Sequence, residues 1–182
     1  TDYRAARSLI GLVPQELAFE MFETVINTVR FTRGLFGKKP YDACLEGVLK
    51  SLTLWDKRDA KIMELSGGMK KRVALAQMLA VDPQLLLLDE PFSALDVQTR
   101  AAMENELLRL WSAERRTVVF ITHDLATVKS IADSIAVMYK GQVVRYGPKA
   151  DVLAPPFDDY TDLLLSSVPE MRLGWLEEVI AR

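Results

Sequence analysis

The spacing of apolar residues divides the chain into stretches with different periods. Residues 9–13 form a short apolar run that Pro14 ends, which predicts a buried strand. After it, apolar positions recur at intervals of three and four, the spacing of one helical face. Two such sets occur, Phe22, Val25, Ile26 and Val29, and then Leu45, Val48, Leu49 and Leu52. Residues 34–40 predict a loop between them, so residues 16–64 predict a helical unit without strands.

From Ser66 onward, helical and strand patterns alternate. Met69, Val73, Ala76 and Ala80 predict a helix that stops at Asp82-Pro83, followed by strands at 85–88, 117–121 and 134–139 and helices at 97–111 and 125–132. Unbroken apolar strands that alternate with helices are typical of a parallel sheet covered on both faces. Gly141-Gln142 predicts a hairpin turn into a strand at 143–146. The tail from Pro148 predicts two short helical segments, separated by Pro155-Pro156 and Pro169.

Composition narrows the class of protein. The 182 residues suffice for one domain that buries roughly 70% of its unfolded surface. A net charge of −2 gives no reason to expect nucleic acid as a partner. Short basic runs such as Lys70-Lys71-Arg72 predict solvated helix faces. The single cysteine, Cys44, excludes an internal disulfide and lies in an apolar pattern that predicts a small buried side chain. No run approaches the roughly 18 apolar residues of a membrane span, so any membrane role would come through partners.

Two consecutive carboxylates, Asp89 and Glu90, end the predicted strand at residues 85–88. In open α/β sheets, ligands bind at the carboxyl edge of the strands. There Asp89 could hold Mg²⁺ through its water shell, and Glu90 could polarise an attacking water as a general base. A core strand that ends in a solvated acidic turn would give the same pattern.

Six further residues carry candidate chemistry. Ser66, Gly67 and Gly68 precede a helix whose terminal N–H groups would attract an anion, although they could equally form a plain N-cap and loop. Asp96 opens the next helix as a credible N-cap. His123, the only histidine, follows the strand at 117–121 and would lie at the same ligand-bearing edge as the carboxylates. Gln15 follows the first strand.

Taken in order, these motifs resemble the ABC ATPase family. Val-Pro-Gln (13–15) looks like its Q-loop, and Leu-Ser-Gly-Gly-Met-Lys-Lys-Arg (65–72) looks like its signature. Leu-Leu-Leu-Leu-Asp-Glu-Pro (85–91), Ser-Ala-Leu-Asp (93–96) and Ile-Thr-His-Asp (121–124) look like its Walker B, D-loop and H-loop. The resemblance implies an α/β fold like that of P-loop NTPases, with a mainly parallel sheet flanked by helices. An α-helical subdomain would be inserted at residues 16–64.

The resemblance also implies a role for each matching residue. Asp89 would serve Mg²⁺, Glu90 would be the hydrolytic base and His123 would contact the γ-phosphate of ATP. Gln15 would link the nucleotide site to a transmembrane permease. Ser66, Gly67 and Gly68 would close over ATP held by a second ABC ATPase subunit in a head-to-tail dimer, with Asp96 at the dimer interface. Met69 stands where the family often has glutamine, a variation that occurs among importer-like relatives.

One expected motif is not present in the chain. A phosphate-binding Walker A loop has the form Gly-x4-Gly-Lys-Ser/Thr, and none of the nine glycines fits it. The nearest match, Gly34 to Lys39, has two residues between its glycines instead of four. Fourteen residues precede Gln15, too few for the loop and the first strands. We therefore expect one partial domain over 1–182, with parts at 16–64, 65–147 and 148–182, that lacks the N-terminal strands and binds ATP weakly alone.

Three functions are compatible with this sequence. The first is the ATP-hydrolysing subunit of an importer, peripheral on the cytoplasmic face of the membrane. Residues 90–140 look like nitrate, sulfonate or taurine importers. Residues 156–161 and 166–171 look like oligopeptide importers, and residues 11–40 resemble a third type, which leaves the substrate open. The second is a non-hydrolysing partner that supplies its signature loop in trans. The third, a chromosome-maintenance or DNA-repair ATPase, is disfavoured because residues 16–64 show no sustained heptads.

Overall fold

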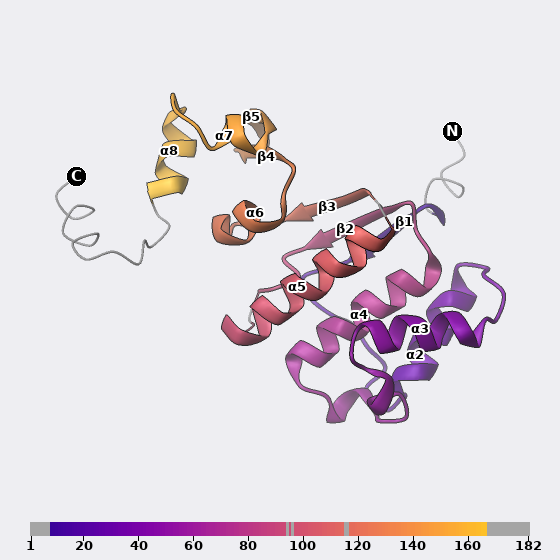
Figure 1. Ribbon diagram of the computed structural model, residues 1–182. Helices are drawn as coiled ribbons and strands as arrows, with labels where there is room; N and C mark the ends of the chain where they lie inside the picture. The colour runs from indigo at the N-terminus through magenta and orange to yellow at the C-terminus, as the bar shows by residue number, and fades with distance from the viewer. Residues whose placement is uncertain (1–7, 94, 96, 115–116, 167–182) are drawn as a thin grey trace. The chain divides into compact units, whose positions relative to one another are not determined.

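A computed structural model describes residues 8–93, 95, 97–114 and 117–166. The chain forms two compact units, Thr1–Ile121 and Thr122–Arg182, and each is described by itself. In Figure 1 the described part of the first unit begins in indigo and that of the second ends in yellow. None of the helices in the described part of the chain is long and apolar enough to cross a membrane.

The first unit is built on a three-stranded parallel sheet. The strands are β1 (Ile10–Val13), β2 (Leu85–Asp89) and β3 (Thr117–Ile121), in the order β1-β2-β3. Ile10 pairs with Leu85, and Leu85 pairs with Thr117. The parallel α/β organisation is therefore confirmed, and all three strands end at a common carboxyl edge.

Only one face of this sheet is well buried. Val13, Leu86 and Leu88 are at most 2% exposed and lie in the main core. On the opposite face, Leu12 is 48% exposed and Ile121 is 48% exposed. The expectation that both faces are covered is wrong for the described residues, because an apolar run shows which side chains can be buried but not which of them are.

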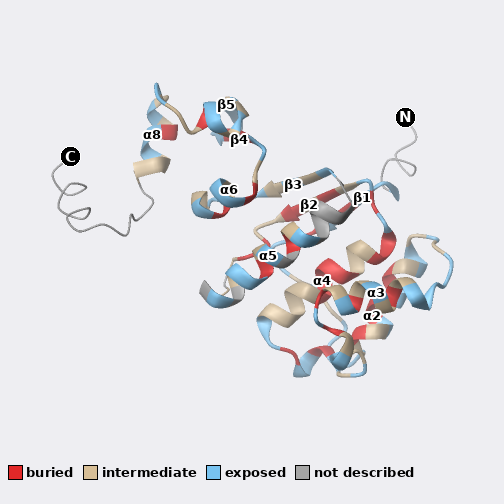
Figure 2. Cartoon of the chain, in the orientation of Figure 1, coloured by how far each residue is buried: buried red, intermediate tan, exposed pale blue. Residues whose placement is uncertain are grey.

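Three helices supply most of the core that covers the buried face. They are α2 (Val25–Leu35), α3 (Asp42–Ser51) and α4 (Gly67–Val81), with the short 3₁₀ helices η1 (Trp55–Lys57) and η2 (Ile62–Glu64) between α3 and α4. Figure 2 shows the buried residues gathered where these helices meet. The fully buried positions include Val25, Val29, Leu49 and Val73. The helical unit predicted for residues 16–64 is present.

Some predicted boundaries in this region are wrong. Phe22 lies before α2 and is 77% exposed, because Thr24 caps the helix by accepting a hydrogen bond from the Asn27 N–H at 3.4 Å. At the other end, Gly34 and Leu35 belong to α2 and not to the loop. Cys44 is half-buried, and the Arg33 guanidinium lies 4.0 Å from its sulfur.

Helix α4 runs antiparallel to β1, as two contacts show. A Cβ on Gly11, near the start of β1, would lie 3.3 Å from the Met78 Cβ and 3.0 Å from the Pro83 Cγ. Beyond the other end of β1, the Gln15 carbonyl accepts a hydrogen bond from Lys71. Glycine is thus required where the end of α4 closes on β1. The start of α4 consequently lies at the carboxyl edge of the sheet.

Helix α5 (Val97–Glu114) follows β2 and adds Met103 and Leu107 to the same core. Its predicted start is confirmed, and it runs three residues past the predicted end. The strand predicted at 117–121 has the same bounds as β3.

The second unit contains α6 (Leu125–Ile131), β4 (Ser134–Tyr139), β5 (Gln142–Pro148), α7 (Lys149–Val152) and α8 (Asp159–Ser166). The hairpin that the sequence predicts from 134–139 into 143–146 is confirmed as the antiparallel pair β4–β5, whereas the expected parallel pairing of 134–139 is wrong for the described residues. The turn lies one residue earlier than predicted, at Lys140 and Gly141, whose φ angles are 48° and 79°. Two positive φ angles are the requirement of a type I′ hairpin turn.

Candidate functional site

The carboxylate pair lies where the sequence predicts, at the carboxyl end of the central strand β2. Asp89 is the last residue of β2 and pairs with Ile121 of β3. Glu90 follows it, and its N–H donates a hydrogen bond to the Ile121 carbonyl at 2.9 Å. Both acidic residues are half-buried. The sheet therefore presents two carboxylates at an edge that a ligand can reach.

The backbone of Glu90 is held in an unusual conformation. Its φ angle is 45°, in the left-handed region that residues with a side chain seldom adopt. The Ser93 N–H and hydroxyl both donate to the Glu90 carbonyl, at 3.1 and 2.8 Å. Such strain persists only where neighbouring groups enforce it, and it concentrates at functional sites.

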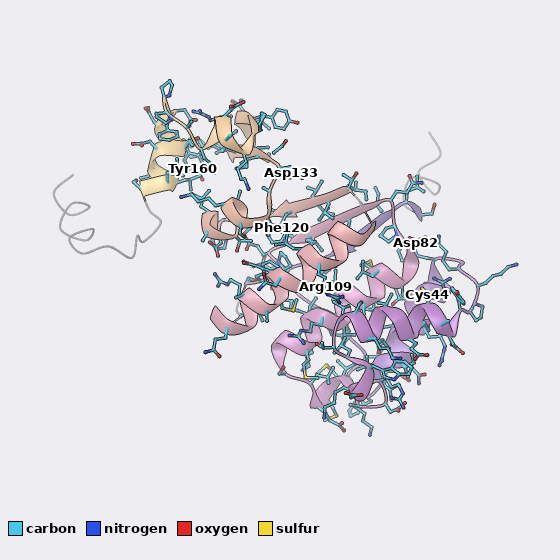
Figure 3. The ribbon with its side chains drawn as sticks, viewed as in Figure 1. Cys44, Asp82, Arg109, Phe120, Asp133 and Tyr160 are labelled. Carbon is cyan, nitrogen blue, oxygen red and sulfur yellow. The ribbon has the colours of Figure 1, made fainter. Side chains whose placement is uncertain are left out.

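Aromatic packing fixes the turn that follows Glu90. Phe92 is buried, and its ring centroid lies 5.3 Å from that of Phe120 on β3, at an interplanar angle of 45°. Figure 3 labels Phe120 beside the strand ends of the first unit. The tilted pair is a favourable aromatic geometry, and it anchors the Glu90 turn to β3 from the core side.

The start of α4 is open to the surroundings of the chain. The Ser66 hydroxyl accepts a hydrogen bond from the Met69 N–H at 3.3 Å and caps the helix, whose first residues are Gly67 and Gly68. A Cβ on Gly67 would meet no heavy atom of the described residues within 4 Å. The fold therefore accounts for Ser66 as an N-cap but does not demand glycine at position 67.

Lys71 is a site residue that the sequence analysis missed. Its Nζ donates to the Gln15 carbonyl at 2.6 Å, which ties α4 to the exposed segment after β1. Partial burial lowers the pKa of the Lys71 ammonium, and the negative charges of Asp89 and Glu90 oppose that shift. The basic run at 70–72 is thus not simply a solvated face. Its position at the edge depends on the direction of α4, which no local pattern encodes.

The remaining candidates are placed less fully. His123 is exposed and belongs to the second unit, in the turn before α6, where the Asp124 side chain caps the helix by accepting from the Ala126 N–H at 2.9 Å. Asp96 lies outside the described residues. The structure places Gln15, Asp89 and Glu90 at one edge of the sheet, since Val13 pairs with Leu88, and Lys71 donates to Gln15 at this edge.

The donor set at this edge suits a magnesium ion that is shared with a phosphate ligand. No group of three or more His, Cys, Asp or Glu side chains gathers within the described residues to form a metal site. Mg²⁺ commonly takes only one or two protein carboxylates and completes its shell with water and phosphate oxygens. The half-buried Asp89 and Glu90 fit that pattern.

Comparison with known proteins supports the family resemblance that the motifs indicate. Residues 1–93 match the family model for the ABC transporter. The chain is 39% identical over 157 residues to the glycine betaine/proline betaine transport system ATP-binding protein ProV of Salmonella typhimurium, covering 85% of the chain and 39% of that protein. It is 35% identical over 172 residues to the methionine import ATP-binding protein MetN 2 of Pectobacterium atrosepticum, covering 93% of the chain and 51% of that protein.

A solved structure gives the same result for the fold. An inward-facing conformation of a metal-chelate type ABC transporter matches with a TM-score of 0.71 and 29% identity, over 79% of the chain and 59% of the solved chain. The α/β fold predicted from the motif order is thus confirmed as that of an ABC ATPase domain. The chain spans about half or less of the length of the curated relatives it matches, 39% and 51% for the two named above.

Proposed function

The chain belongs to the ABC transporter family, and from this premise we propose that it is the ATP-binding and ATP-hydrolysing part of an importer. The observation that carries the proposal is the Asp89-Glu90 pair at the carboxyl end of β2, with the Glu90 backbone hydrogen-bonded to Ile121. Names of relatives support the importer class, since they include a methionine import protein and an Fe(3+) ions import protein.

We assign a division of work to the two carboxylates. Asp89, at the end of the strand, would hold Mg²⁺ through its water shell, and the ion would neutralise charge on the phosphates of ATP. Glu90 would accept the proton of the attacking water as a general base. The hydrogen bonds from Ser93 and to Ile121 keep Glu90 in place for that step without reorganisation.

The remaining candidate residues would bind the nucleotide or connect the site to other subunits. His123 would contact the γ-phosphate, and Gln15 would carry the state of the site to a transmembrane permease on the cytoplasmic face of the membrane. Ser66, Gly67 and Gly68 would cover ATP held by a second ATPase subunit, with Asp96 at that interface. The open space above Gly67 supports this part of the proposal.

Hydrolysis assays test the assignment. In the full-length protein that the gene encodes, Glu90→Gln should retain ATP binding. It should lower the hydrolysis rate by roughly 100-fold or more, as expected for loss of a general base. Asp56→Asn, an exposed acid in the helical unit, is the matched control and should leave the rate unchanged. Hydrolysis by Glu90→Gln at the wild-type rate would overturn the assignment.

The chain of residues 1–182 should bind Mg-ATP weakly, because it contains no Gly-x4-Gly-Lys-Ser/Thr loop to surround the phosphates. Equilibrium titration of this chain with Mg-ATP measures the affinity directly. Micromolar affinity, together with hydrolysis that Glu90→Gln abolishes, would contradict this expectation.

A second candidate function is favoured by the exposed start of α4. A chain that presents Ser66 and Gly67 outward could complete an ATP site in another subunit without hydrolysing ATP itself. Mixing the chain with a full-length homologue separates the two functions. A rise in turnover that Ser66→Ala and Gly67→Val abolish, and Glu90→Gln does not, would support the partner role.

A further inference from the structure

Lys71 lies between a neutral backbone carbonyl after β1 and the negatively charged carboxylates at the end of β2. On one side its Nζ donates to the Gln15 carbonyl at 2.6 Å. Val13, two residues before Gln15, pairs with Leu88, so the Lys71 ammonium lies at the same carboxyl edge as Asp89 and Glu90, whose negative charges attract it. One side chain thus links the segment after β1 to the charge at the end of β2.

The neighbouring cation in the same basic run has a different place. The Arg72 guanidinium contacts the Thr53 hydroxyl, and its Nε lies 3.4 Å from the Met103 sulfur. Arg72 therefore contacts the helical unit and α5, whereas Lys71 contacts the segment at the sheet edge. The side chain of Lys71 is half-buried, so its cation is less screened by water than a fully exposed one.

From this arrangement we propose that Lys71 is a positioning residue that couples divalent-cation binding at Asp89 to the hold on the Gln15 segment. The inference rests on the proposed function, which places the metal at Asp89. An ammonium beside two carboxylates stabilises them in the absence of metal. A divalent cation held by Asp89 repels the same ammonium, and so Lys71 lowers the affinity of the edge for the ion.

The coupling has a consequence in both directions, because linkage between two equilibria is reciprocal. Cation binding weakens the Lys71–Gln15 hydrogen bond and loosens the segment after β1. Removal of the charge at Lys71 strengthens cation binding and uncouples the segment from it. A lysine that only holds the segment in place would affect the segment and leave metal affinity unchanged.

Binding of Mn²⁺ to the protein with a non-hydrolysable ATP analogue, followed by the paramagnetic signal of the unbound ion, tests the effect of the Lys71 charge on cation affinity. The experiment uses the same full-length protein as the hydrolysis assay. Lys71→Gln keeps a hydrogen-bond donor and loses the charge, and it should tighten Mn²⁺ binding by roughly three- to tenfold, the scale of one charge at a partly solvated site. Lys71→Arg keeps the charge and should bind as the wild type does. Lys70→Gln, one position away on α4, is the matched control for loss of a charge.

Hydrogen exchange tests whether cation binding loosens the segment after β1. In the wild type, Mn²⁺ should raise the exchange of backbone amides at residues 15–20, and in Lys71→Gln it should not. Asp89→Asn distinguishes a failure of the inference on Lys71 from a failure of the metal assignment at Asp89. If Asp89→Asn weakens Mn²⁺ binding but Lys71→Gln binds as tightly as the wild type, the inference on Lys71 is wrong and the metal site stands. If Asp89→Asn has no effect, the metal assignment itself fails and the inference falls with it.

Discussion

The side-chain amide of Gln77 donates a hydrogen bond to the hydroxyl of Thr32 at 2.7 Å, across the contact between α4 and α2. The same hydroxyl donates to the Thr28 carbonyl at 3.1 Å, and Thr32 is 6% exposed. Partly buried polar side chains thus join the two helices. The Thr32 hydroxyl both accepts and donates a hydrogen bond, so removing this hydroxyl leaves the Gln77 amide without its acceptor.

Thr32→Val should destabilise the first unit by about 1–2 kcal/mol, since it leaves the Gln77 amide without its acceptor. The double variant Thr32→Val with Gln77→Leu should recover most of that loss, because both partners are then apolar. Urea unfolding followed by tryptophan fluorescence measures both. Thr117→Val, an exposed threonine on β3, is the control. A double variant less stable than Thr32→Val would contradict the account.

Gly11→Ala should destabilise the first unit by about 1–3 kcal/mol, the usual cost of overpacking a core. The added Cβ would lie 3.0 Å from the Pro83 Cγ and 3.3 Å from the Met78 Cβ, so the end of α4 must shift away from β1. The measurement is the midpoint of urea unfolding. Gly47→Ala on α3, where no described heavy atom lies within 4 Å, should instead be neutral or stabilising by up to about 1 kcal/mol. Equal midpoints for the two variants would show that α4 does not press on Gly11.

Arg145→Lys should destabilise the second unit by about 1–3 kcal/mol. The Arg145 guanidinium donates to the carbonyls of Pro156, Asp151 and Ala154 at 2.6 to 2.8 Å and lies 5.5 Å from the Phe157 ring. Lysine keeps the charge but lacks the planar fork that reaches three acceptors at once. Thermal unfolding of the second unit, with Lys129→Ala as the control, measures the effect. A midpoint unchanged by Arg145→Lys would mean that charge alone suffices.

Acid should selectively weaken α8. The Thr161 hydroxyl donates to Asp158 at 2.6 Å and its N–H at 2.9 Å, and these bonds lower the pKa of the Asp158 carboxyl. A lowered folded pKa means that the folded state binds fewer protons than the unfolded state. The stabilisation is therefore present above the unfolded pKa of about 3.9 and is lost as the pH falls through the folded pKa.

A comparison of the wild type with Asp158→Asn over this range measures the contribution. The stability difference should be largest near neutral pH and should shrink on acidification. Thr161→Val, which removes the stronger donor, should reduce the pH-dependent difference. A difference that is constant with pH would refute the role of the charged carboxylate.

Much of the fold follows from apolar periodicity, because burial selects the residues that set it. The bounds of β3 and β4 match the predicted strands, since both are compact apolar runs between polar residues. Phe22 shows where the method fails. It has helical spacing from Val25, but Thr24 between them begins the helix, and a capping residue outweighs one apolar position.

The candidate site likewise contains residues whose position the sequence predicts and one whose position it does not. Asp89 and Glu90 were predictable because a strand end determines where they lie. Lys71 was not, because its contact with Gln15 depends on the direction of α4 across β1. The turn at Gly141 predicts the hairpin of β4 with β5. The apolar run at 134–139 does not show that this strand lies outside the parallel sheet of the described residues, since strand periodicity identifies a strand but not its neighbour.

The left-handed backbone of Glu90 restricts which amino acids can occupy position 90, whatever the reaction requires. Glycine, asparagine and aspartate adopt this conformation at little cost, whereas valine and isoleucine resist it. A library of all substitutions at this position would therefore contain two kinds of inactive protein. Asparagine and glycine should fold with a normal turn and lose only the base, while β-branched residues should also disturb the packing of Phe92 against Phe120. The set of residues tolerated at position 90 thus distinguishes the backbone conformation that the turn requires from the carboxylate that the reaction requires.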